Sequence, residues 1–271
     1  MLYGCLPSKI DVRDYELCAS NVGAVSFPEK FELQNLPKVK YQGNVNSCCA
    51  HATSSIAEYH DGNKHTMSTN FLYGIQKKLF NQCQFGMYLS QACEIMRDYG
   101  DMVEEDCKGN TEIPNCYAIA EDAFNSTSKR SRAYDYRIDS YYLCRKDNDI
   151  KLALTQYGPV LGAVMWHDVF TIDKDYIINF DEKSDKGGHA VMIVGWDDKK
   201  GWLIQNSWSE NWANHGRCYI PFEYGFYEAR AMIDHPNEED PAMVFPHDKM
   251  PSWIAKIINF IINLFRNKKN G

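Results

Sequence analysis

The spacing of apolar residues changes near the middle of the chain. In the first half, residues 48–59, 69–79 and 86–100 are rich in apolar residues at helical spacing and predict three helices, the last capped by Gly100. Residues 101–128 have few periodic signals and predict loops with short helices. The first half is therefore expected to be mainly helical.

The second half has the pattern of a strand-rich region. Residues 135–142 predict a strand, and residues 149–157 predict an amphipathic helix that ends at Gly158-Pro159. Short runs of β-branched or aromatic residues then predict four strands, at residues 160–166, 190–196, 201–206 and 217–220.

A chain of 271 residues can form two lobes that share a cleft. We expect an α+β fold with a mainly helical lobe over residues 28–128 and a mainly β lobe over residues 129–235. Residues 1–27 form an N-terminal extension of polar, mostly extended character, and residues 236–271 follow the β lobe.

The C-terminal segment begins with an acidic, proline-bounded linker. Residues 253–265 then carry isoleucine and phenylalanine at helical spacing, followed by Arg266, Lys268 and Lys269. This stretch is too short to cross a bilayer, which takes about 20 residues. It predicts a helix that lies on an anionic membrane surface or docks on its own protein or on a partner, and the sequence leaves these alternatives open.

Composition and charge restrict the possible partners and the compartment. The net charge of −7 argues against a nucleic-acid partner held by charge, and the hydrophobic (44%) and charged (24%) fractions are ordinary for a globular protein. The N-terminus lacks the basic start and apolar run of a secretory signal. We therefore favour free, buried thiols for most of the ten cysteines; export would favour disulfides instead.

Three separate stretches carry candidate chemistry. Cys48 follows a helix-capping Ser47, at the positive end of a helix dipole, where the thiol should lose its proton more easily than a free thiol. Gln42 offers an amide that can donate to an oxyanion beside that sulfur. His189 precedes an apolar strand, and Asn206 ends a second strand. Attack by a cysteine on an amide needs this combination of thiolate, imidazole, orienting group and oxyanion donors.

The order and flanks of these residues resemble the papain family of cysteine peptidases. The resemblance rests on Gln42 before Ser47-Cys48-Cys49-Ala50, on Gly187-Gly188-His189-Ala190-Val191, and on Asn206-Ser207-Trp208, and it covers roughly residues 28–235. In this family the histidine and asparagine follow the cysteine by roughly 130–150 residues. His189 lies within that range and Asn206 slightly beyond it.

The resemblance implies a two-lobed fold, a helical lobe whose central helix carries Cys48 and an antiparallel, barrel-like β lobe that carries His189 and Asn206. It implies an endopeptidase that forms a thioester through Cys48, with His189 as base and acid, Asn206 as its orienting group and Gln42 as oxyanion donor. Trp208 would shield the His189–Asn206 bond. Substrate contacts are expected at Gly86, Ala163, Gly188 and Ala190.

The same resemblance implies a protein or peptide substrate, a monomer, and no metal or organic cofactor. The details are closest to the signal-less bacterial and viral branch. The lack of a secretory signal favours a cytoplasmic or virion-associated location over a lysosomal or secreted one. In that branch the N-terminal segment can lie across the cleft, so residues 1–27 are either such a propeptide-like segment or a surface tail.

Several alternatives remain. Cys49 stands where the family has a non-cysteine residue, although the register favours Cys48 as the nucleophile. Zinc at Cys48-Cys49-Ala50-His51 is disfavoured because no second cysteine pair has ligand spacing. Other functions to weigh are acyl transfer to an amine, exopeptidase activity, a catalytically silent binding protein, and a membrane-peripheral protein acting through its C-terminal helix. By resemblance, Val45, Ser209 and Ala213 depart from the family pattern.

Overall fold

The computed structural model of the chain describes residues 3–9, 14–19, 26–81, 86–108 and 115–234. Residues 1–234 form one compact unit. The C-terminal helix predicted over residues 253–265 lies outside the described residues. Among the described helices, none combines the length and the apolar character that crossing a bilayer demands.

Most helices of the described chain come from its first half, as predicted. They are α1 (Cys48–His60), α2 (Thr69–Leu79), α3 (Leu89–Asp98), α4 (Asn115–Asn125) and α5 (Thr127–Ala133). The predictions for α1 and α2 are confirmed. The third helix begins later than predicted, because Met87–Tyr88 form a short strand, β4. Residues 101–128 are more helical than predicted, because α4 is stabilised by packing against α2, a contact between distant segments that local periodicity does not reveal.

The second half builds one mixed sheet with the strand order β11-β10-β9-β6-β12-β5-β2, and β3 also pairs with β9. Its strands are β2 (Glu16–Leu17), β3 (Lys30–Glu32), β5 (Ser140–Cys144), β6 (Val160–His167), β9 (Lys186–Asp197), β10 (Gly201–Gln205), β11 (Arg217–Ile220) and β12 (Glu228–Ile233). The described strands follow an open path and close no barrel, which corrects the barrel-like expectation. A separate hairpin pairs β7 (Phe170–Ile172) with β8 (Ile178–Phe180).

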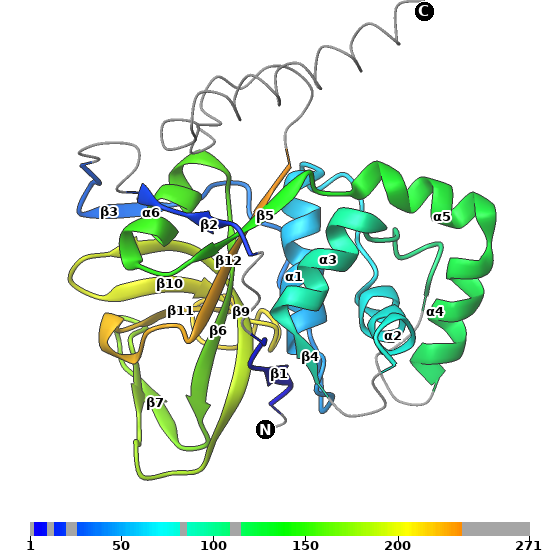
Figure 1. The fold of residues 1–271 in the computed structure, drawn as a ribbon. Coiled ribbons are helices and arrows are strands. Elements are labelled where there is room, and N and C mark those ends of the chain that lie inside the picture. Colours follow the sequence, from blue (N-terminus) through cyan, green and yellow to red (C-terminus); the bar gives the residue numbers. More distant parts are fainter. Residues whose placement is uncertain (1–2, 10–13, 20–25, 82–85, 109–114, 235–271) are drawn as a thin grey trace, which may run out of the picture. The chain divides into compact units, whose positions relative to one another are not determined.

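The two faces of the sheet belong to two cores, because successive residues of a strand point to opposite faces. Leu161 and Ala163 of β6 share one core with α1, α2 and α3, whereas Val160 and Val164 share the other with α6 (Asp147–Gln156). Figure 1 shows α1 to α5 gathered beside the sheet and α1 running closest to it. The first residue of α1 therefore lies close to β9, which α1 contacts.

The N-terminal extension is part of the folded unit and adds strands to both halves. β1 (Cys5–Leu6) pairs in parallel with β4, and β2 pairs in parallel with β5. β3 lies on the sheet, although residues from 28 onward were assigned to the helical lobe. In Figure 1 the blue N-terminal strand β1 lies between the sheet and the helices.

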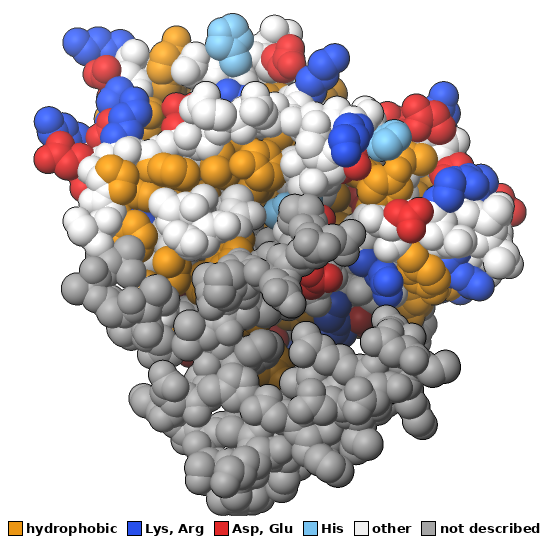
Figure 2. All heavy atoms as spheres, turned by 90° about the horizontal axis from the view of Figure 1, so that it is seen from above, with side chains coloured by type: hydrophobic (Ala, Val, Ile, Leu, Met, Phe, Trp, Pro, Cys, Tyr) orange, Lys and Arg blue, Asp and Glu red, His pale blue; other side chains and the backbone are white. Residues whose placement is uncertain are grey.

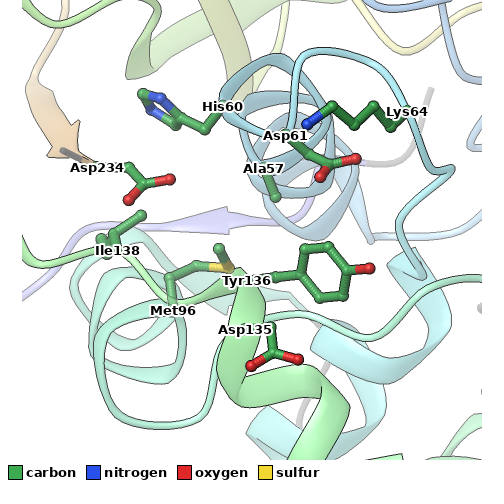
Figure 3. Close-up of a pocket in the computed structure, with 9 residues that line it drawn as sticks. All are labelled: Ala57, His60, Asp61, Lys64, Met96, Asp135, Tyr136, Ile138 and Asp234. Carbon is green, nitrogen blue, oxygen red and sulfur yellow. The ribbon is translucent and has the colours of Figure 1, made fainter. Parts of the chain in front are cut away.

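One face of the molecule and a small cavity at the end of α1 are drawn in Figures 2 and 3. On the face drawn in Figure 2, basic and acidic side chains are intermixed, with apolar side chains between them. A cavity of about 170 Å³ lies at the C-terminal end of α1, and Figure 3 draws its lining residues, among them Asp61, Lys64, Asp135 and Tyr136. This cavity is separated from Cys48 by the length of α1, roughly 18 Å at 1.5 Å per residue.

Candidate active site

Cys48 is the first residue of α1 and is buried. Ser47 occupies the N-cap position, as predicted, but its side chain makes no capping hydrogen bond. The Sγ atom of Cys48 accepts a hydrogen bond from the backbone N–H of Ala190 at 3.4 Å, and the backbone N–H of Gly4 lies near enough to the sulfur to favour the thiolate. The thiol at the start of the helix is thus held against β9, next to the residue that follows His189.

His189 on β9 meets Asn206, which directly follows the neighbouring strand β10. The Nε2 atom of His189 lies 2.8 Å from Oδ1 of Asn206, which also accepts from the backbone N–H of Ser207 at 2.8 Å. An amide oxygen can only accept hydrogen bonds, so the Nε2 atom of His189 must carry the hydrogen in this pair, which fixes the tautomer of the ring. Nδ1 of His189 is buried and has no hydrogen-bond partner among the described residues. It is therefore left as the basic nitrogen.

Two tryptophans enclose the His189 ring. Trp208 stacks on it with ring centroids 4.9 Å apart and planes at 29°, and Trp166 meets it edge-on at 5.2 Å. Trp212 extends this aromatic group beyond Trp208. Trp208 was expected here from the sequence, whereas Trp166 was not. The signal for Trp166 was its place on β6 opposite Gly187, two residues before His189 on the paired strand β9.

Gln42 is attached to the loop that carries Asn206. Its backbone N–H donates to the carbonyl of Ser207 at 2.9 Å, and its Oε1 accepts from the Ser207 hydroxyl at 2.5 Å. Nε2 donates to the carbonyl of Val45 at 2.9 Å. An amide nitrogen has two hydrogens, so one remains for a further acceptor. The tertiary structure therefore brings Gln42, distant in sequence, to the His189–Asn206 pair.

The N-terminal residues 3–8 run through this site in extended form. Asn46 donates from Nδ2 to the carbonyl of Tyr3, and the Tyr3 hydroxyl donates to Oδ1 of Asp168 at 2.6 Å. The carbonyl of Gly4 accepts from the Met87 backbone N–H at 2.7 Å. The N–H of Gly4 faces the Cys48 sulfur, so this segment covers the sulfur directly.

Two of the four predicted substrate contacts, Gly86 and Gly188, lie against this segment. A Cβ atom added at Gly86 would come within 2.7 Å of the Gly4 carbonyl, and one at Gly188 within 2.0 Å of the Cys5 carbonyl. Gly86 also has a φ of +92°, which L-residues rarely adopt. Ala163 and Ala190 are paired on β6 and β9. At Gly86 and Gly188 the wall is bare backbone, as needed where another chain approaches closely.

Burial sets the protonation of the covered site. The pKa of the Cys48 thiol is raised by burial, with partial compensation from its backbone N–H partners, and burial lowers the pKa of His189 to about 4 against the effect of its bond to Asn206. Both groups are therefore neutral near pH 7. The sequence predicts a lowered pKa for the Cys48 thiol, and this prediction is wrong for this structure, because the effect of burial outweighs that of the backbone N–H groups near the sulfur.

The neighbours of Cys48 take structural positions. Cys49 is fully buried, and the pKa of its thiol is raised mainly by burial. Nδ1 of His51 lies 2.9 Å from the Ser47 carbonyl, one helical turn earlier. Further along the Asn206 loop, Ser209 and Ala213 adopt positive φ angles of 75° and 46°, so this loop keeps a backbone conformation that favours glycine.

These features define a class of protein: a mixed helix-and-sheet fold in which a buried cysteine at a helix start contacts the strand that carries a histidine, and that histidine pairs with an asparagine. The pattern of the papain family cysteine proteases matches residues 27–231, most of the chain. The chain therefore belongs to the papain family of cysteine proteases.

Known relatives agree with this assignment. A cysteine protease of Blomia tropicalis is 25% identical over 234 residues, 72% of this chain and 61% of that protein. A cathepsin B-like cysteine proteinase of Schistosoma japonicum is 30% identical over 108 residues, 39% of this chain and 31% of that protein. The match to a third relative, a cathepsin B-like cysteine proteinase 3 of Ostertagia ostertagi, covers 64% of that protein. The chain thus spans less than two thirds of the length of these relatives.

Solved structures share the fold. Xylellain, a cysteine protease from Xylella fastidiosa, superposes with a TM-score of 0.71 at 21% identity, over 86% of this chain and 96% of that one. A procathepsin B of Trypanosoma congolense gives a TM-score of 0.63 at 17% identity, over 87% of each chain. These likenesses show the papain-like fold, and the matches give no support to the viral origin considered from the sequence.

Proposed function

We propose that the chain is a cysteine endopeptidase in which Cys48 is the nucleophile. The observation that carries the proposal is the pairing of His189 Nε2 with Asn206, which leaves Nδ1 as an unpartnered base in the site that holds the Cys48 sulfur. Family membership adds that the substrate is a protein or peptide.

In the proposed reaction, Nδ1 of His189 takes the Cys48 proton and the sulfur attacks the carbonyl carbon of the scissile bond. The tetrahedral oxyanion accepts hydrogen bonds from the Cys48 backbone N–H and from Nε2 of Gln42. Imidazolium then protonates the departing amine and a thioester remains on Cys48. A water molecule that loses its proton to His189 hydrolyses this thioester and restores the thiol.

Residues 3–8 act in this proposal as a built-in inhibitor. A substrate must present a carbonyl carbon to the sulfur, whereas this segment presents the N–H of Gly4. The segment is therefore held at the nucleophile without being positioned for attack. It passes Cys48 on both sides, with Tyr3 at Asn46 and Cys5 at Gly188, which supports a cleft open at both ends and cleavage within a chain.

Active-site labelling with an epoxide inhibitor of the E-64 type, followed by peptide mass mapping, tests both proposals. The protein is the full chain and the same chain with an engineered protease site within residues 20–25, folded intact and then cut. Label is expected on Cys48, faster after cutting, absent in Cys48→Ser and retained in the matched variant Cys49→Ser. Absence of label from every folded, reduced form would overturn the nucleophile, and equal rates before and after cutting would overturn the inhibitor.

A further inference from the structure

A buried arginine faces the same groove as the catalytic residues. Arg230 on β12 is only 2% exposed, and its guanidinium is held between two carboxylates. Nε donates to Oε1 of Glu228 at 2.6 Å, while Nη1 and Nη2 donate to the two oxygens of Asp14 at 3.1 and 2.8 Å. A two-pronged bond of this kind is the geometry in which arginine recognises a carboxylate.

The strand register connects this arginine to the catalytic residues. Ala190, whose N–H bonds the Cys48 sulfur, pairs with Ala163, and Ala163 pairs in turn with Glu228. Each step between paired strands is about 4.8 Å. Arg230 lies two residues beyond Glu228 and therefore on the same face of the sheet. The Glu228–Arg230 pair thus lines the groove a few residues of extended chain away from Cys48.

The covering segment follows this path. Gly4 and Cys5 lie at the catalytic end, the backbone N–H of Ser8 donates to Oε2 of Glu228 at 3.1 Å, and Asp14 reaches Arg230. A cavity of about 620 Å³ adjoins the Asp14 end. The groove therefore accommodates an extended chain that brings a carboxylate to Arg230.

Of the two carboxylates that bind Arg230, one stays in the uncovered enzyme and the other leaves with the N-terminal segment. Glu228 belongs to the same strand as Arg230 and stays when the segment leaves, so its charge remains neutralised by the arginine. Asp14 belongs to the segment that must be displaced before any substrate reaches Cys48. Its departure removes the partner of two guanidinium nitrogens, and another carboxylate can take its place with the same two-pronged bond.

We propose that Arg230 forms a carboxylate-binding subsite, so that the uncovered enzyme prefers peptides with an aspartate or glutamate a few residues from the scissile bond. Asp14 of the N-terminal segment occupies this subsite in the covered state. The inference rests on the proposed peptidase function. A basic side chain is disfavoured at the same place, because the carboxylate of Glu228 is already paired with Arg230.

The test uses the chain that has been folded, cut within residues 20–25 and freed of its segment. A peptide library identifies the position at which acidic residues are enriched, and matched peptides with Glu or Gln there are compared. We expect kcat/KM to favour Glu by about tenfold or more, as for other hydrogen bonds to charged groups. The ratio should fall to about one in Arg230→Met and remain intermediate in Arg230→Lys, which keeps the charge but loses the two-pronged bond.

A second measurement does not depend on turnover. The freed Cys48→Ser chain binds a synthetic peptide of residues 3–19, and the same peptide with Asp14→Asn should bind about tenfold more weakly. That difference should disappear in Arg230→Met. Equal rates for Glu and Gln peptides, enrichment of lysine or arginine, or equal binding of both synthetic peptides would overturn the subsite. Failure of Cys48 to take the epoxide label would instead overturn the peptidase proposal.

Discussion

Cys48 has a permanent neighbour on one side and a replaceable one on the other. The permanent side is β9, which carries His189, and the paired strand β10, which ends one residue before Asn206; both strands are buried along most of their length. The replaceable side is the N-terminal segment, whose two-residue strand β1 and a few polar contacts lie over the sulfur. In the described part of the chain, the N-terminal segment covers Cys48 but does not hold His189 or Asn206. The segment can therefore leave while the geometry of the catalytic residues is kept.

The largest effect on activity is expected from replacing His189, the proposed base, which lies on the permanent side of Cys48. His189→Ala should lower kcat/KM of the cut chain by roughly 10⁴-fold or more, as for other catalytic units of nucleophile and base. His65→Ala, which removes an exposed histidine paired with Asp61, is the matched control and should leave the rate unchanged. Steady-state kinetics on both variants decides the matter, and a loss below tenfold in His189→Ala would contradict the assigned role.

Gln42 is hydrogen-bonded to Ser207 on the permanent side and is the proposed donor to the oxyanion. Gln42→Ala should lower kcat of the cut chain by roughly 10² to 10³-fold, the usual loss for one oxyanion donor, with little change in substrate binding. Gln34→Ala, an exposed glutamine on the loop before Gln42, serves as control. Thermal melting of both variants separates this effect from the lost bond to Ser207, and a change confined to KM would count against an oxyanion role.

Acid should weaken the covered state, because the folded chain keeps two buried histidines neutral. Burial lowers the pKa values of His189 and His51 to about 4, so the unfolded chain binds more protons between about pH 6.5 and 4. The free energy of unfolding should therefore fall as pH falls through this window, by up to about 3 kcal/mol for each histidine.

Urea unfolding of the full chain at several pH values measures this dependence. His189→Gln should reduce the pH dependence of the free energy of unfolding by the part that His189 contributes. The freed chain, in which solvent reaches the site, should have a smaller slope than the full chain. The same slope in both would show that the cover does not set the protonation of His189.

The smallest effect is expected from removing a single hydrogen bond of the N-terminal segment, and it is measured as the labelling rate of Cys48. Tyr3→Phe removes the exposed hydroxyl bond to Asp168 and keeps the ring against Gly187. Epoxide labelling of Cys48 in the full chain should accelerate by about twofold to fivefold, the range of one neutral-to-charged bond at the surface. Tyr41→Phe, an exposed tyrosine beside Gln42, provides the control and should label at the unchanged rate.

The sequence alone determined the local structure and the identity of the candidate residues. The spacing of apolar residues predicted α1 and α2, and the short motifs around Cys48, His189 and Asn206 indicated the family, because local periodicity and side-chain chemistry are properties of neighbouring residues. The family assignment is confirmed, while the individual catalytic roles stay predictions. The sequence predicted only loops with short helices where the regular helix α4 forms, since its packing on α2 involves residues distant in the chain.

Only the tertiary structure decided what depends on long-range contacts. It brought Trp166 to His189, placed Gly4 on the Cys48 sulfur and raised the pKa of that thiol by burial, contrary to the sequence-based expectation. It also joined Asp14 to Arg230 across most of the chain. Desolvation and ion pairing arise from whichever groups the fold brings together, and a local sequence pattern carries no record of those distant partners.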